Sequence, residues 1–217
     1  DLPIHALPTN HDLWGQQDAE AWEELIGPKR TAVDLPGLRI VLWDDMERHP
    51  QRGLLPWVTD EKLAWLEDAV GSALGPVAVA HHAPMLPVGE GFHDCWQPED
   101  AHRALDLFRR HGVRALITGH WHRNGEWEAN GVRVINTGAL CGWQWTGTPG
   151  HYSFPTRPGY RLFAWDGQEL RSFWREASYF MKPAPRCQVT LQWVGPAHTG
   201  GPRPQVHAVE VSASCRL

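Results

Sequence analysis

The sequence lacks long hydrophobic runs: its purely apolar stretches hold only a few residues, as at 77–80, so none can span a bilayer as a helix. Cysteine is scarce, with four in 217 residues, and no Cys-x-x-Cys pair occurs, which excludes a zinc knuckle and a dithiol redox motif. Positive charge is also scarce. The formal net charge of −5 argues against a nucleic-acid surface built on bulk positive charge.

What is abundant is tryptophan and histidine, with 13 residues of each. Tryptophan indicates aromatic cores or ligand platforms, and histidine favours metal binding. With 42% hydrophobic and 21% charged residues the composition is that of a globular chain, which excludes disordered and fibrous classes. The first residue is Asp1, so we expect any targeting segment to lie upstream, and the sequence leaves the cellular compartment open. It also leaves the oligomeric state open.

Apolar runs that alternate with helical patterns predict an α/β fold in which helices cover a sheet. Strands are expected at 38–43, 77–80 and 113–117. Thr59 is expected to cap a helix over 60–74, and Pro98 to begin a second helix over 98–111. From residue 131 onward the pattern is all-β, with strands expected at 132–135, 160–165, 170–174, 189–194 and 206–211.

The segment Lys182-Pro183-Ala184-Pro185 is the expected linker. Residues 1–181 would then form the main domain, and residues 186–217 a small β extension or the start of a truncated module, because two strands are too few to fold alone. A Cys187–Cys215 disulfide would require an oxidising compartment.

Three polar motifs follow expected strands: Thr9-Asn10-His11-Asp12, His81-His82-Ala83-Pro84 and Gly119-His120-Trp121-His122. Loops beyond the carboxyl ends of such strands gather into one crevice, so we expect these motifs to converge. Histidine nitrogens and an asparagine oxygen suit Zn, Mn or Fe better than Ca or Mg alone.

Spacing refines the prediction. In extended backbone His120 and His122 would face the same site, whereas the adjacent His81 and His82 would point in opposite directions, so that one of them at most is a ligand. Other interpretations remain. The Asn-His-Asp triplet also suits an Asx-turn or a cap for a helix over 18–26. The pair Asp44-Asp45 suits either additional metal ligands or a solvated turn.

In this order the motifs resemble those of the calcineurin-like metallophosphoesterases. The blocks of that family run Asp-x-His, Gly-Asp, Gly-Asn-His-(Asp/Glu), a His after a strand, and Gly-His-x-His. Residues 9–12 resemble the third block with Thr9 in place of Gly, His81 resembles the fourth, and residues 119–122 match the fifth. Residues 136–139, 142–145, 158–160 and 166–167 are similar to bacterial members that resemble cyclic-nucleotide phosphodiesterases. The resemblance covers about residues 1–180.

The resemblance implies a helix-covered β-sandwich, truncated at its N-terminus, because the first two blocks are missing before Asn10. The chain would be the carboxyl-terminal part of an enzyme with about half of a binuclear centre, and two divalent ions (Mn, Fe or Zn) are expected in the full-length protein. By resemblance, Asn10, His81 and His120 would hold the second metal and His122 the first. We expect His82 to point away from the cluster.

The implied activity is metal-dependent hydrolysis of a small-molecule phosphoester, with monoesters, diesters and nucleotides all open as substrates. His11 would protonate the leaving oxygen and Asp12 would orient it. Weaker candidates for the substrate pocket are His93, Trp96, Trp143, Trp145 and His151. We expect the isolated chain to be inactive, or nearly so.

The alternative is a non-catalytic Trp-rich β binding module whose histidines are incidental or hold a single metal. A structural zinc site is normally closed by four Cys or His ligands, and the cysteines do not lie near the histidine motifs, which counts against a structural zinc site.

Overall fold

The computed structural model describes residues 3–15, 18–86, 98, 100–122, 124–129, 131–140, 158–177, 187–193 and 209–215. The chain divides into two compact units, residues 1–177 and 178–217. The three polar motifs all lie in the first unit.

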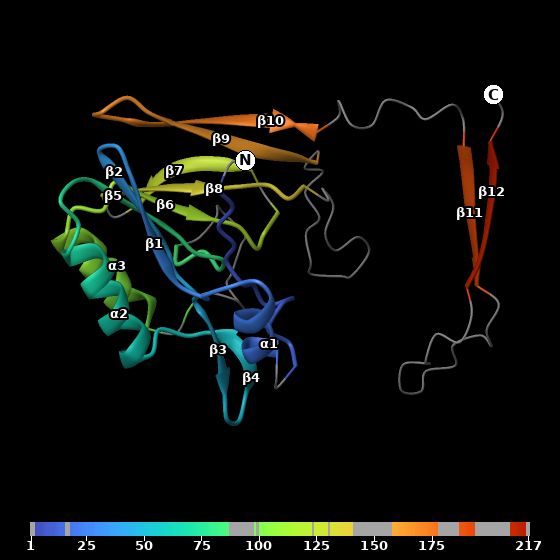
Figure 1. Ribbon diagram of the computed structural model, residues 1–217, viewed down its shortest axis with the longest axis horizontal. Coiled ribbons are helices and arrows are strands. Elements are labelled where there is room, and N and C mark those ends of the chain that lie inside the picture. Colours follow the sequence, from blue (N-terminus) through green and yellow to red (C-terminus); the bar gives the residue numbers. More distant parts are fainter. Residues whose placement is uncertain are drawn as a thin grey trace. The chain divides into compact units, whose positions relative to one another are not determined.

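A six-stranded sheet is the centre of the first unit (Figure 1). Its strand order is β1 (Thr31–Leu35), β2 (Leu38–Leu42), β5 (Val77–Ala80), β6 (Ala115–Thr118), β8 (Val132–Asn136) and β7 (Gly125–Ala129). The four inner strands run parallel and the two edge strands run antiparallel to their neighbours. The carboxyl ends of the inner strands therefore meet at one edge of the sheet.

Two helices connect the parallel strands. Helix α2 (Asp60–Gly71) begins as predicted, since the side-chain oxygen of Thr59 accepts a hydrogen bond from the Lys62 amide at 3.3 Å. Helix α3 (Ala101–Arg110) begins later than predicted, after Asp100, whose backbone is left-handed. Helix α1 (Asp18–Leu25) lies near the N-terminus and buries none of its residues.

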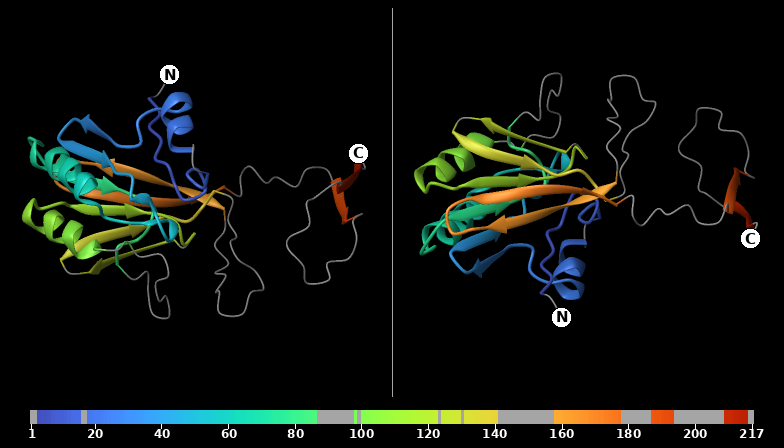
Figure 2. Two further views of the ribbon diagram at one scale, coloured as in Figure 1. Left: turned by 90° about the horizontal axis from the view of Figure 1, so that it is seen from below. Right: turned by 90° about the horizontal axis from the view of Figure 1, so that it is seen from above.

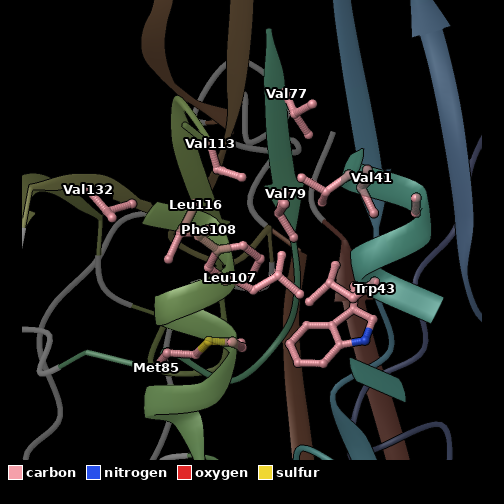
Figure 3. Close-up of a cluster of buried hydrophobic side chains, with 14 of the residues drawn as sticks. Val41, Trp43, Val77, Val79, Met85, Leu107, Phe108, Val113, Leu116 and Val132 are labelled. Atoms are coloured by element: carbon pink, nitrogen blue, oxygen red, sulfur yellow. The ribbon is translucent and has the colours of Figure 1, made fainter. Parts of the chain in front are cut away.

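Alternation along the inner strands sends side chains to both faces of the sheet. On one face Val77 and Val79 pack in a cluster with Trp43, Leu107 and Phe108, so that α2 and α3 cover this face (Figure 3). On the other face a second cluster contains Leu38, Ala78, Ala115, Ile135, Leu170 and Trp165.

The last two residues of that second cluster belong to an antiparallel pair, β9 (Gly159–Trp165) and β10 (Leu170–Glu176). The helices and this pair lie on opposite sides of the sheet (Figure 2). The prediction of an α/β fold with a helix-covered β-sandwich is confirmed.

The sequence did not reveal four strands: β1, β7, β3 (Met46–His49) and β4 (Gly53–Pro56). All four are short and pair antiparallel, either at a sheet edge or with each other, so continuous apolar runs do not mark them. Conversely, residues 3–9 form no strand before the first motif. Pro3 and Pro8 lack the amide hydrogen that a sheet ladder needs.

The second unit contains β11 (Cys187–Trp193) and β12 (Val209–Cys215), which pair antiparallel. Their register places Cys187 opposite Cys215. The expected linker at 182–185 lies outside the described residues. Among the described helices, none is long and apolar enough to cross a membrane.

Candidate functional site

The carboxyl edge of the inner strands carries the polar motifs. Strand β2 is followed by Trp43-Asp44-Asp45, β5 by His81-His82, and β6 by the loop 119–122. The parallel pairing of β2, β5 and β6 brings these three loops together, as expected for a sheet of this kind.

Three side chains from distant segments meet at this edge. The Nε2 atom of His82 lies 2.7 Å from Oδ1 of Asn10 and 3.0 Å from Nδ1 of His120. Asn10 is 5% exposed and His120 is 9% exposed. We call Asn10, His82 and His120 the edge trio.

The adjacent histidines diverge, but not in the predicted sense. His81 is buried, and its Nδ1 donates to Oδ2 of Asp45 at 3.2 Å, whereas His82 joins the edge trio. The expectation that His82 points away from the cluster is therefore wrong. Alternation predicted the divergence correctly, and only the structure shows which ring faces Asn10.

Asp44 and Asp45 are both buried, so the interpretation of a solvated turn is wrong. Asp44 lies against the buried Lys62, with 3.2 Å between Oδ2 and Nζ, and also accepts from the Met46 amide at 3.0 Å. Burial raises the pKa of Asp44 despite the nearby ammonium. Burial also opposes ionisation of Asp45, but the hydrogen bonds that its carboxylate accepts from His81 and from the Ala83 amide hold the pKa of Asp45 below its ordinary value.

The Gly-His-Trp-His loop is not extended. His120 and His122 have φ angles of +62° and +50°, in the left-handed region that non-glycine residues rarely adopt. The premise that placed both rings on one side is therefore wrong. His122 nevertheless lies close enough to His120 for its charge to act on that ring.

Burial favours the neutral form of the two imidazoles in the edge trio. Burial, together with the nearby histidines, lowers the pKa of His120 to about 3. Burial also lowers the pKa of His82. Neutral rings present a nitrogen lone pair, which is the form that binds metal ions.

The first motif forms a turn. The Asp12 carboxylate accepts hydrogen bonds from the amide and the hydroxyl of Thr9, at 2.8 and 2.7 Å, and the Asp12 amide donates to the Thr9 carbonyl at 3.1 Å. Within this turn Asn10 is buried and His11 is exposed. The catalytic roles expected of His11 and Asp12 stay predictions.

The edge trio fits a single metal ion. A ring nitrogen carries one hydrogen at most, so His82 Nε2 cannot make a full hydrogen bond as donor to Asn10 and also as acceptor from His120. A cation would accept all three lone pairs, and two imidazoles with an amide oxygen suit a transition metal or zinc.

No larger metal cluster is formed by the described residues, among which no group of three or more His, Cys, Asp and Glu side chains is arranged to hold a metal. The expected pocket residues His93, Trp96, Trp143, Trp145 and His151 lie outside the described residues. Sequence reasoning predicted neither the contact of His82 with Asn10 and His120 nor the burial of Asp45, although the His-His pair and the acids after the strand at 38–43 are visible in the sequence.

Comparison with known sequences gives one informative relative. No model of a known protein family matches the chain. A glycerophosphodiester phosphodiesterase, GpdQ of Enterobacter lignolyticus (strain SCF1), is 30% identical over an alignment of 133 residues, and the match covers 55% of this chain and 45% of the relative. The chain thus spans less than half the length of the curated relative that it matches.

Solved structures with a similar arrangement share little sequence. The Plasmodium protein GAP50, described as an anchor in the inner membrane complex, covers 62% of this chain and 44% of its own length at 15% identity, with a TM-score of 0.42. The Thermus thermophilus sulfate thiohydrolase SoxB covers 70% of this chain and 26% of its own at 14% identity, with a TM-score of 0.37.

Proposed function

We propose that this chain belongs to the calcineurin-like metallophosphoesterases and carries part of a metal-dependent phosphoesterase centre. The observation that carries the proposal is the convergence of Asn10, His82 and His120 at the carboxyl edge of the sheet. The similarity to a glycerophosphodiester phosphodiesterase supports it. The edge trio would hold one divalent ion of a binuclear centre, with His82 in the place predicted for His81 and with His122 near the second ion.

The bound ion would supply Lewis-acid polarisation of a phosphoryl oxygen and would acidify a water molecule. The chain's own residues would do the rest. Asn10 and His11 are neighbours with divergent exposure, so the buried amide of Asn10 would help to hold the ion and the exposed imidazole of His11 would face a substrate. His11 would donate a proton to the leaving oxygen of a small phosphoester, and Asp12 would hold the turn that presents it.

The ligand assignment is tested by titrating the metal-free chain with Zn²⁺ in a calorimeter. His82→Ala and His120→Ala should each lose most of the binding, whereas His11→Ala should keep it. The control is His102→Ala, an exposed histidine of α3, which should bind as the unmodified chain does. Zn²⁺ binding that survives both His82→Ala and His120→Ala would contradict the assignment, and no binding at all would favour the Trp-rich binding module.

The role of His11 is tested in the full-length protein with two aryl phosphodiesters that differ in leaving-group acidity. His11→Ala should lower kcat and kcat/KM together by about 10²–10⁴-fold, and by less for the more acidic leaving group, which needs less protonation. Bound metal should not change. A loss of metal equal to that of His120→Ala would show that His11 is a ligand.

The 217-residue chain is tested separately. We propose that it shows little or no turnover of an aryl phosphodiester when Zn²⁺ or Mn²⁺ is added, because the trio supplies ligands for one ion only. Robust turnover would show that the half-centre assignment is wrong.

A further inference from the structure

The segment that carries His82 is held by one buried carboxylate. Oδ2 of Asp45 accepts a hydrogen bond from Nδ1 of His81 at 3.2 Å and another from the amide of Ala83 at 2.6 Å. These donors belong to the residues immediately before and after His82. A single oxygen therefore fixes the chain on both sides of the proposed ligand.

Asp45 is itself held rigidly. It is 0% exposed, and its carbonyl accepts from the Trp57 amide at 2.9 Å. Two residues earlier, the Trp43 amide donates to the Ala80 carbonyl at 2.9 Å, which extends the pairing of β2 and β5 up to the loops. The carboxylate is thus a fixed point relative to the strand that ends at His81.

The other side of His82 is tied to the His120 loop. The carbonyl of His82 accepts from the Gly119 amide at 3.1 Å, and the His81 amide donates to the Ile117 carbonyl at 3.0 Å. These backbone bonds set the spacing of the two loops. They do not fix the direction of the His82 ring, which depends on the conformation of the turn at 81–83. The two hydrogen bonds to Asp45 hold that turn.

We infer that Asp45 is a positioning residue, which orients His82 so that its Nε2 faces Asn10 and His120. The inference rests on the proposed metal site. Neighbouring Asp44 has a different partner set, Lys62 and the Met46 amide, and none of the hydrogen bonds found for it reaches the 81–83 turn. Asp44 therefore stabilises the fold without orienting the trio, and it offers a matched control.

The test compares Asp45→Leu, Asp45→Asn and Asp44→Asn in the full chain. Co²⁺ is titrated into each metal-free variant, and its visible absorption gives both the Kd and the band position that reports the ligand set. Asp45→Leu removes the acceptor and should weaken Co²⁺ binding by about 10–100-fold without moving the band, as is usual when the partner that orients a ligand is lost. Asp45→Asn can place its amide oxygen at the Oδ2 position and should keep most of the affinity. Asp44→Asn should bind Co²⁺ as the unmodified chain does.

Urea unfolding of the metal-free variants shows which of them fold. If Asp45→Leu does not fold, Asp45→Ser replaces it, since the shorter side chain cannot reach both donors. Unchanged Co²⁺ affinity in a folded Asp45→Leu or Asp45→Ser variant overturns the inference, as does an equal loss in Asp44→Asn. A shifted band would mean that Asp45 is a direct ligand, which also overturns it. If the unmodified chain binds no Co²⁺, the proposed metal site fails instead.

Discussion

The stability of the metal-free chain should fall steeply between pH 6 and pH 4, because His120 is buried in its neutral form. The folded pKa of His120 is about 3, mainly because of burial, whereas an unfolded histidine titrates near 6.5. Within that window the unfolded chain binds a proton that the folded chain does not. The stability that the neutral His120 ring contributes is therefore present in full well above pH 6.5, and it is lost progressively as the pH falls toward 3.

The size of the effect follows from the two pKa values. One proton of difference changes the free energy of unfolding by about 1.4 kcal/mol per pH unit, so His120 alone accounts for a loss of about 2–3 kcal/mol between pH 6 and pH 4. His82, whose pKa burial also lowers, adds a change in the same direction. Asp45 contributes to stability through its lowered pKa, and this contribution is lost at more acidic pH, as the pH falls through the folded pKa of Asp45.

The assay is urea unfolding with EDTA at pH 6, 5 and 4, on the chain and on two variants. His120→Gln should reduce the pH slope by about 1.4 kcal/mol per unit, whatever it does to stability at pH 6. His102→Gln changes an exposed histidine and should leave the slope as it was. If His120→Gln loses stability with pH as steeply as the unmodified chain, the reasoning about its buried neutral ring is refuted.

Two further predictions concern stability and are checked by urea unfolding at pH 7. Lys62→Met leaves the buried Asp44 without its cation and should cost about 3–5 kcal/mol, and adding Asp44→Asn should restore part of this; equal stability of the single and double variants would contradict the argument. Gly159→Ala should cost about 1–3 kcal/mol, because the new Cβ would lie 2.5 Å from the Arg175 carbonyl. The control Gly125→Ala meets no atom within 4 Å, so a comparable loss there would show that crowding is not the cause.

The parts of the fold that the sequence predicted are those with local causes. Thr59 caps α2 through a side chain three residues from its partner, and the apolar run at 77–80 marks a strand whose side chains are largely buried on both faces of the sheet. Strands β1 and β7 depend on a partner strand for their ladders, and their exposed residues leave no comparable pattern.

The candidate site was predictable as a place but not in its details. That His81 and His82 diverge follows from alternation, but which of them faces Asn10 depends on Asp45, some 36 residues earlier in the chain. The left-handed backbone of His120 and His122 has no sequence signal, because no glycine or asparagine occupies either position. The burial of Asp44 depends on Lys62 folding over it from α2.

The wide spacing of the edge trio has a consequence for folding kinetics. Asn10, His82 and His120 are separated by 72 and 38 residues along the chain. Closing loops of that length is slow and loses much chain entropy, so the trio can assemble only after β5 and β6 have paired. In a stopped-flow refolding experiment, the Co²⁺ absorption of the chain should therefore appear with the last phase of tryptophan fluorescence. A metal signal from this edge then reports completed long-range folding, not a local loop that forms early.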